Sequence, residues 1–404
     1  MANNTGTSGS GRSTVAAGAI LGAAAAVWAG RRIQEFARTE RPEGMVNWKR
    51  SLEIALRMNK ESALTAAERA SLSESYGKMV DDCVPLISEY TQTTLPEGAR
   101  ETFAFDRVDW IHANLAGFQR MFAPIEELDA GPGQNRNPVS KFVGGVNQAV
   151  LSAEIGLLLG YMAKRVLGQY DLALLGREPV SAGKLYFVEP NIKGIERKLN
   201  LPQQDFRMWL ALHETTHAFE FEAYPWVREH FNGLLERYMG FMREDAEYLR
   251  QGVEGVKVLA KRIREGNNGN GDDSGTWIES FMNAEQRALF AEMQAMMCVI
   301  EGYSNHVMNA VGRDLLPNYD YISRKFEERQ KERSAGEQLF ARLTGLNVKM
   351  EQYRQGEAFV NAIVERHGRE AIDWLWTGPE TMPSMAEIRD PSQWTERIMR
   401  SNLN

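Results

Sequence analysis

The stretch His213-Glu214-Thr215-Thr216-His217 decides the fold class of this 404-residue chain. On a helix, His213 and His217 lie one turn apart on the same face, so two imidazoles can meet one cation. Glu214 lies beside the first imidazole, where its carboxylate can act on a water held by that cation. The spacing therefore predicts a helix that carries a two-histidine metal site next to an acid.

This HExxH spacing is that of zinc peptidases, in which zinc lowers the pKa of its bound water toward ~7 and the glutamate takes that water's proton. The chain has six histidines. At roughly 7% glutamate the motif is expected by chance only about 0.006 times in such a chain. The competing interpretation, two histidines on the polar face of an ordinary helix, is the weaker one. We expect Zn²⁺ as the cofactor, His213 and His217 as ligands, and Glu214 as the general base.

The residues around the motif predict a helix inside a folded body. Pro202 suits the first turn of a helix, and bulky apolar residues follow over much of the circumference, so we expect a helix at residues 202–221 that Pro225 ends. Residues 184–188 read as a short strand. By analogy with zinc peptidases, this strand would form the rim of the cleft, where an extended substrate could pair with it.

A catalytic zinc site commonly has three protein ligands, so the motif leaves one ligand open. A metzincin would have a third histidine at position 223, which is Ala223. Glu236 follows His217 by the spacing of one-zinc aminopeptidases, but it stands in a charge-rich helical stretch where an acid is usually solvated. Glu301 stands in a strongly apolar run, where an acid is costly to bury unless it is paired or binds metal. We predict Glu301, with Glu236 as the alternative.

Five further residues are candidates for a supporting role. Asn305 shares a helix face with Glu301 and could hydrogen-bond a ligand imidazole. Lys349 and Tyr353, one turn apart, could donate to an oxyanion, although a surface pair is an equal alternative. Arg228 is a similar candidate, as is Tyr224. The remaining histidines are expected to be surface or core residues: His112, His230, His306 and His367.

Several further short sequences resemble a bacterial family of zincin-like metalloproteases, often described only as hydrolases. The resemblance extends from about residue 45 to the C-terminus. These sequences are VNW at 46–48, RVDW at 107–110, NLAGF at 114–118, LLLGY at 157–161, VLGQYD at 166–171, VEPN at 188–191, PWVR at 225–228, EG at 301–302, VM at 307–308 and QYRQG at 352–356. The resemblance implies a zincin fold, a zinc ion, and Glu301 of the EG pair as third ligand.

The resemblance leaves the substrate open. One branch of the family is named for an association with biosynthesis of the deazaflavin coenzyme. That name reflects which genes occur together and establishes no reaction. This chain has Asn305 where the family usually has an acid, and Tyr303 where histidine is frequent. An asparagine can still accept a hydrogen bond from histidine, but it polarises the imidazole less than a carboxylate does.

The composition is that of an ordinary globular protein, with 43% hydrophobic and 25% charged residues. A net charge of -7 gives no electrostatic argument for nucleic acid as a partner. The two cysteines, Cys83 and Cys298, make no disulfide framework and are expected to be buried thiols in a reducing compartment.

Residues 1–44 are predicted to be a flexible N-terminal segment that contains an uncharged, alanine-rich stretch at 14–29. That stretch is short and weakly hydrophobic for a membrane span, and arginines follow it. We expect a cytoplasmic protein. The alternative is a membrane anchor through 14–29, with the catalytic domain in the cytoplasm. The oligomeric state is not predicted.

Residues 45–404 are predicted to form one zincin-like catalytic domain, mainly α (α+β), with a small β element beside the HExxH helix. Helices are expected at 47–59, at 63–95 with breaks, and at 137–168, where Gly156 and Gly160 indicate close helix packing. A second strand is expected near 101–108. Residues 131–138 and 266–275 are expected to be loops, the second of them a surface insertion.

The expected function is that of a zinc-dependent metallohydrolase, a metallopeptidase that cleaves a peptide or amide bond by Glu214-assisted attack of zinc-bound water. The expected partner is a peptide or small amide substrate. Two alternatives remain open at this point. One is a non-catalytic, zinc-stabilised interaction protein that serves a cofactor biosynthetic pathway. The other is a hydrolase of a small non-peptide amide.

Overall fold

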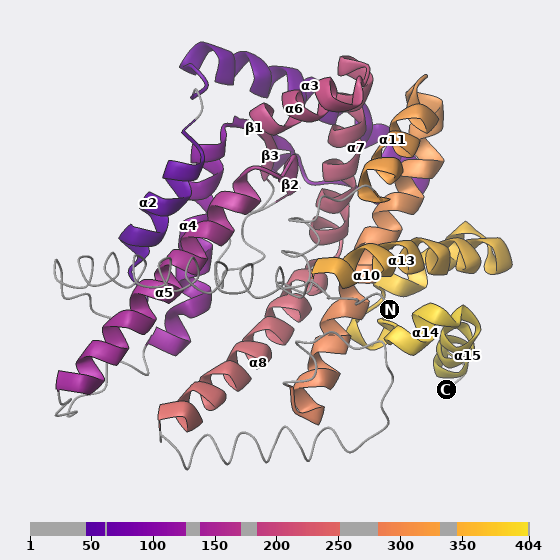
Figure 1. Cartoon of the computed structure of the whole chain (residues 1–404). Coiled ribbons are helices and arrows are strands. Elements are labelled where there is room, and N and C mark those ends of the chain that lie inside the picture. The colour runs from indigo at the N-terminus through magenta and orange to yellow at the C-terminus, as the bar shows by residue number, and fades with distance from the viewer. Residues whose placement is uncertain are drawn as a thin grey trace, which may run out of the picture.

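The computed structural model describes residues 46–60, 63–126, 138–170, 184–250, 282–331 and 346–402. Within these ranges the chain is mostly helical, with one small three-stranded sheet (Figure 1). The predicted fold class, mainly α with a small β element, is confirmed. The segment 1–44 and the loop at 266–275 lie outside the described residues, as do residues 131–137 of the other predicted loop.

The first half contains α2 (Trp48–Met58), α3 (Ala66–Thr91), η1 (Glu97–Arg100), β1 (Glu101–Phe105), α4 (Arg107–Glu126), α5 (Pro138–Ala163), β2 (Gly168–Tyr170), β3 (Lys184–Val188), α6 (Glu189–Leu199) and α7 (Gln203–Glu222). The second half contains α8 (Pro225–Arg250), α10 (Ala284–Leu315), α11 (Tyr319–Lys331), α13 (Leu346–His367), η4 (Arg369–Trp376), η5 (Pro379–Thr381), α14 (Met385–Arg389) and α15 (Pro391–Asn402).

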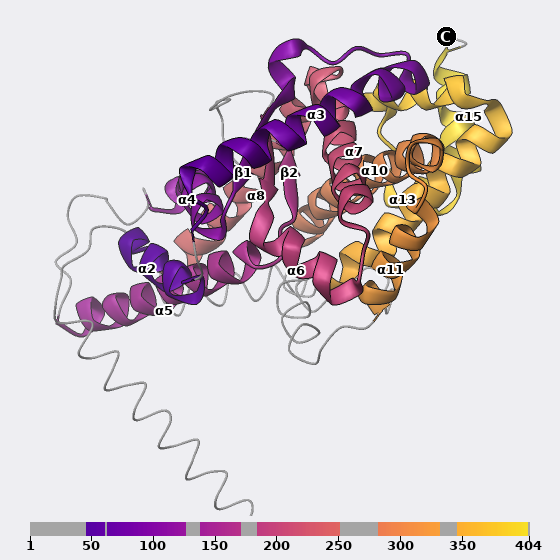
Figure 2. The same cartoon turned by 90° about the horizontal axis from the view of Figure 1, so that it is seen from above.

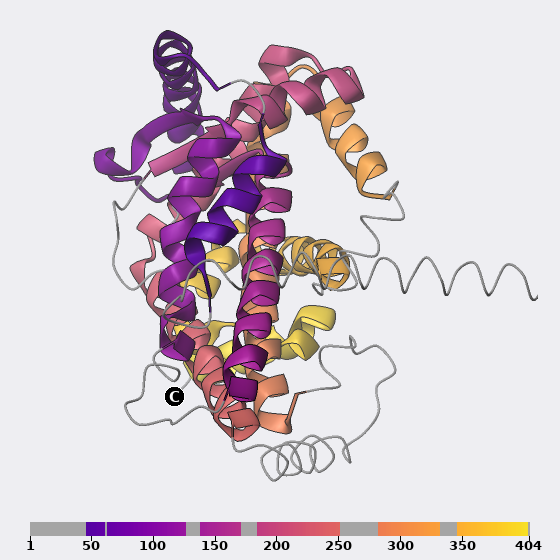
Figure 3. The same ribbon diagram turned by 60° about the vertical axis from the view of Figure 1, so that its left-hand side comes forward.

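Helices α2, α4 and α5 form a layer of their own, which Figure 3 brings forward. The glycines of α5 allow α2 to lie close: a Cβ at Gly156 would stand 2.6 Å from the backbone oxygen of Ser51, and one at Gly160 would stand 2.7 Å from Sδ of Met58. The predicted close packing is confirmed. A second, smaller hydrophobic cluster lies between these helices and includes the buried Trp110 of α4.

The sheet has the strand order β1-β3-β2, with β1 parallel and β2 antiparallel to β3. Both strand predictions are confirmed, the second over the five residues of β1. Strand β2 is not predicted from the sequence because three residues show no alternation. Its presence makes β3 the central strand, paired on both sides, so the rim position predicted for residues 184–188 is wrong. Within the described residues, β1 and β2 are the two edge strands.

A buried group of charged side chains ties α7 to the elements around it. Glu189 is fully buried and accepts from Nη2 and Nη1 of Arg207 at 2.7 and 3.1 Å and from the hydroxyl of Tyr76 at 2.9 Å. Nε of Arg207 donates to Glu196 at 2.8 Å. These bonds join α3, α6 and α7, and removing one member would leave buried charge without a partner.

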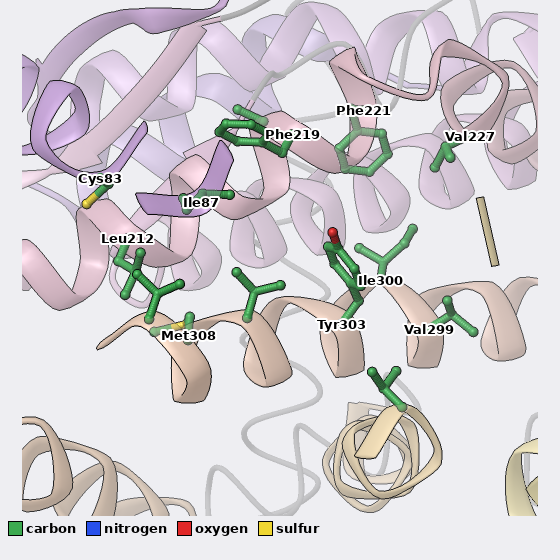
Figure 4. Packing of buried hydrophobic residues seen from close by; sticks show 14 of the residues in the cluster. Cys83, Ile87, Leu212, Phe219, Phe221, Val227, Val299, Ile300, Tyr303 and Met308 are labelled. Carbon is green, nitrogen blue, oxygen red and sulfur yellow. The ribbon is translucent and has the colours of Figure 1, made fainter. Parts of the chain in front are cut away.

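The main hydrophobic core lies between α3, α7, α8, α10 and α13. Helices α7 and α10 pack against one another in its middle, as the views in Figures 1 and 2 agree. Figure 4 shows core side chains of α10, among them Tyr303, turned toward α7 residues such as Phe219. Cys83 and Cys298 are both free and buried, as predicted.

Helices α10 and α13 cross at two glycines. A Cβ at Gly302 would stand 2.2 Å from the backbone carbon of Gly356, and a Cβ at Gly356 would stand 1.9 Å from the backbone oxygen of Cys298. The backbones therefore touch where α10 carries Glu301.

In the part of the chain that the structure describes, no helix combines the length and the apolar character that crossing a bilayer requires. The stretch 14–29, the predicted alternative anchor, lies outside that part.

Candidate metal centre

Helix α7 holds the HExxH residues in the body of the protein. It begins one residue after Pro202, close to the predicted start, and most of its residues are buried. The two threonines of the motif are fully buried, and their hydroxyls donate to helix carbonyls: Thr215 to Ala211 at 2.6 Å and Thr216 to Leu212 at 2.9 Å. These bonds satisfy the hydroxyls of both buried threonines.

His213 and His217 of α7 meet Glu301 of α10. One ligand atom from each of the three residues lies within 4.8 Å of the others. Zinc binds nitrogen and oxygen ligands at about 2.0–2.2 Å, so two ligands of one ion lie at most about 4.4 Å apart. Atoms within 4.8 Å of one another could therefore hold one ion after a small adjustment of their side chains. Glu236 is exposed on α8 and does not belong to this group. The structure brings together the three ligands that the sequence predicts and favours Glu301 over the alternative.

Each histidine is engaged through Nδ1. Nδ1 of His217 lies 2.6 Å from Oε2 of Glu220, and Nδ1 of His213 lies 3.2 Å from Oγ of Ser304 and 3.1 Å from Sδ of Met308. These contacts leave Nε2 of each ring as the metal-binding atom, and the carboxylate fixes the orientation and raises the basicity of His217. Among the described residues, no hydrogen bond joins Asn305 to either histidine, so its supporting role stays a prediction.

The electrostatics of the site suit a cation. Burial and the neighbouring His217 lower the pKa of His213 well below its usual value, which keeps that imidazole neutral, as a metal ligand must be. Burial opposes protonation of His217, but Glu220, Glu301 and Glu214 raise its pKa to about 9. Three carboxylates around one ring favour positive charge there. Two imidazoles and one carboxylate are also the donor set of many catalytic zinc sites, so these residues fit Zn²⁺.

Glu220 is the site residue that the motifs do not predict. It is fully buried, burial raises its pKa to about 7, and its Oε1 has no hydrogen-bond partner within the described residues. In the sequence it argues only against a metzincin, whose motif has glycine at this position. The signal that could have found it is its position three residues after His217, which places an acid on the histidine face of the same helix.

Glu214 is 6% exposed and lies against the edge strand β2. An ideal Cβ built on Gly168 would stand 2.4 Å from Oε1 of Glu214 and 2.6 Å from its Cδ and Cγ. The backbone of β2 thus forms a wall behind the carboxylate of the expected general base. The sequence does not predict this contact because it does not predict β2.

The remaining oxyanion candidates are placed only in part. Arg228 donates from Nη2 to Oε1 of Glu222 at 2.8 Å, which ties the start of α8 to the end of α7. Lys349 and Tyr353 lie on α13, but their side chains are outside the described residues. Tyr224 stacks on an aromatic ring of η4, and burial raises its pKa to about 12. The roles of these four side chains toward an oxyanion stay predictions.

His306 lies on α10 but is engaged elsewhere. Its Nε2 is 2.6 Å from the hydroxyl of Tyr90, and its Nδ1 is 2.6 Å from Oδ1 of Asn361. Burial lowers its pKa, so the ring is neutral. It is the satisfied core histidine that the sequence predicts.

Comparison with known proteins agrees with this geometry. The sequence model of the zincin-like metallopeptidase family matches residues 46–395. The chain is also similar, at 40% identity and a TM-score of 0.64, to the crystal structure of "a putative hydrolase with a novel fold" from Chloroflexus aurantiacus, over 89% of this chain and 99% of that one. The comparison with curated proteins finds no match. The chain belongs to the zincin-like metallopeptidase family.

Proposed function

We propose that this protein is a zinc-dependent hydrolase of peptide or amide bonds. His213, His217 and Glu301 would hold the zinc ion, and Glu214 would be the general base. The observation that carries the proposal is the meeting of these three ligand atoms within 4.8 Å, from two helices, with Glu214 next to the first ligand. The family supports a metal-dependent hydrolase, and the choice of a peptide or amide bond is part of the proposal.

A zinc ion in this site would supply Lewis acidity toward the scissile carbonyl and the attacking water. Glu214 would take a proton from that water and pass it to the leaving amine, as general base and then general acid. Its burial shields the carboxylate from bulk water. Glu220 would hold His217 in the orientation that presents Nε2.

Strand β2 is the element that an extended substrate would meet first. Within the described residues β2 pairs on one side only, with β3, and its Gly168 lies against Glu214. A substrate that added a strand to this edge would cross the site beside the general base. We therefore assign the rim of the cleft to β2. The proposed partner is a peptide or a small amide, and the net charge of -7 gives no reason to add nucleic acid.

The test compares the wild type with Glu214→Gln on peptide libraries and small amides, with Glu229→Gln, an exposed acid of α8, as control. We expect Glu214→Gln to keep its zinc and to lose at least about 10²-fold in kcat, the scale of general-base catalysis, while the control keeps its activity. Wild-type turnover by Glu214→Gln would show that Glu214 is not the general base. A wild type with zinc but without turnover on any substrate would favour the non-catalytic alternative.

A further inference from the structure

We propose that Gly168 is a positioning residue for the general base: the absence of a side chain at this point of β2 sets where the carboxylate of Glu214 stands. The inference rests on the proposed function, in which Glu214 acts on the attacking water. Its basis is the contact of β2 with Glu214, where a Cβ at Gly168 would come within 2.4 Å of Oε1 and 2.6 Å of Cδ and Cγ. Real Cβ atoms do not approach other atoms so closely, so a methyl group here forces something to move.

The backbone of Gly168 itself does not require glycine. Among the described glycines only Gly368 has a positive φ, so Gly168 adopts a conformation that any residue can adopt. The reason for glycine at this position is therefore the space that Glu214 occupies. Gly302 and Gly356 differ, because a Cβ at either of them meets backbone atoms.

Strand β2 cannot retreat from Glu214. Gly168 pairs with Phe187 of β3. The backbone oxygen of Leu167, the residue before Gly168, accepts a hydrogen bond from the amide of Val188 at 2.8 Å. On the other side, Nε1 of the buried Trp110 donates to Oε1 of Gln169 at 2.7 Å. Bonds on both sides of Gly168 thus fix the strand, and the far end of the Glu214 side chain is the part that can yield.

A methyl group at position 168 should therefore displace a carboxylate and leave the fold in place. Displacing a catalytic group by about 1 Å can cost on the order of 10²-fold in rate. The proposed zinc ligands His213 and His217 lie close to Glu301 of α10, and the three atoms nearest to a Cβ at Gly168 all belong to Glu214, so metal binding should persist. The expected signature is loss of kcat without loss of metal.

The experiment compares Gly168→Ala with Gly194→Ala, a glycine of α6 whose added Cβ meets nothing within 4 Å. Both variants should hold one metal per chain, with the same Co²⁺ absorption spectrum as the wild type after substitution. We expect kcat of Gly168→Ala to fall about 100-fold while KM stays within about threefold, and Gly194→Ala to keep its kcat. A purely structural role would change KM or the metal content together with kcat, and it would lower Tm whether or not Glu214 is present. An unchanged kcat in Gly168→Ala would overturn the inference.

A second readout does not depend on activity. Gly168→Ala is introduced into the wild type and into Glu214→Ala, which lacks all three atoms that the new methyl meets. We expect the substitution to lower Tm by about 1–4 °C in the presence of Glu214 and not in its absence. If Gly168→Ala lowered Tm equally in the wild type and in Glu214→Ala, the contact between position 168 and Glu214 would be wrong. Absence of turnover by the wild type on every amide tested would instead overturn the proposed function, which keeps the two failures distinguishable.

Discussion

His217 stands between the proposed metal and a buried carboxylate. Its Nδ1 lies 2.6 Å from Glu220, and the pKa of His217 rises to about 9 because Glu220, Glu301 and Glu214 outweigh the effect of burial. Carboxylates in this position orient a histidine ligand and raise its basicity. In this chain the acid comes from the same helix as the histidine, and Asn305 has no bond to the ring among the described residues.

Replacing Glu220 by Gln should weaken zinc binding by about 10- to 100-fold, because the amide cannot supply the negative charge that polarises His217. The measurement is a competition titration with a chelating dye. Glu229→Gln, an exposed acid of α8, is the matched control and should bind zinc as the wild type does. Equal zinc affinity in Glu220→Gln would show that Glu220 does not support the ligand.

For single residues, the sequence predicts the metal ligands but not the residues that hold the site in place. The HExxH spacing fixes His213 and His217, and the cost of burying an acid in an apolar run singles out Glu301. Both arguments need only one helix at a time. Glu220 stands three residues after His217, a spacing that could have found it. Gly168 acquires its role from a strand that three residues form, which a spacing argument does not reach.

Helix α10 brings Glu301 to α7, and its own position depends on contact with α13. A Cβ at Gly302 would stand 2.2 Å from the backbone carbon of Gly356 and 2.6 Å from the backbone nitrogen of Glu357. Backbone atoms cannot swing aside as a side-chain end can. Gly302, next to the proposed third ligand Glu301, therefore sets the distance between α10 and α13.

Gly302→Ala should destabilise the protein by about 1–3 kcal/mol or more, as overpacking of a core does, and should weaken zinc binding because the ligand beside it shifts. Thermal unfolding and zinc titration measure the two effects. Gly240→Ala on α8 is the control, since its Cβ would meet nothing within 4 Å. Wild-type stability in Gly302→Ala would contradict the close crossing of α10 and α13.

The helices are predictable at the level of elements because their patterns are long. Periodicity and capping residues give α2, α5 and α7 to within a few residues, and Asn47 caps α2 by accepting from the amide of Arg50 at 2.9 Å. The order of the strands is not predictable in the same way. It depends on the pairing of the three-residue strand β2 with β3, and the strand proposed to meet a substrate depends on that pairing.

Across the whole molecule, several buried acidic groups are neutral in the folded state. Burial raises the pKa of Tyr319 and Tyr224 from 10.0 to about 12, and that of Cys298 from 9.0 to about 12. A group whose pKa is higher in the folded state contributes stability below its unfolded pKa and loses it as pH rises toward the folded value.

Stability should therefore decline from about pH 9 to pH 12, as these groups begin to ionise preferentially in the unfolded chain. The measurement is Tm against pH, recorded together with the tyrosinate absorbance. We expect part of the tyrosinate signal to appear only with unfolding. Complete ionisation of the tyrosines near pH 10 in a protein that remains folded would contradict the burial of Tyr319 and Tyr224.

The central claim is that His213, His217 and Glu301 bind one zinc ion, and zinc content by elemental analysis tests it most directly. The proteins to compare are the wild type, His213→Ala, Glu301→Ala and Glu236→Ala, each purified and reconstituted with zinc. We predict about one zinc per chain in the wild type and in Glu236→Ala, and loss of the metal in the other two. A wild type that stays free of zinc, or loss of metal only on replacing Glu236, would contradict the account.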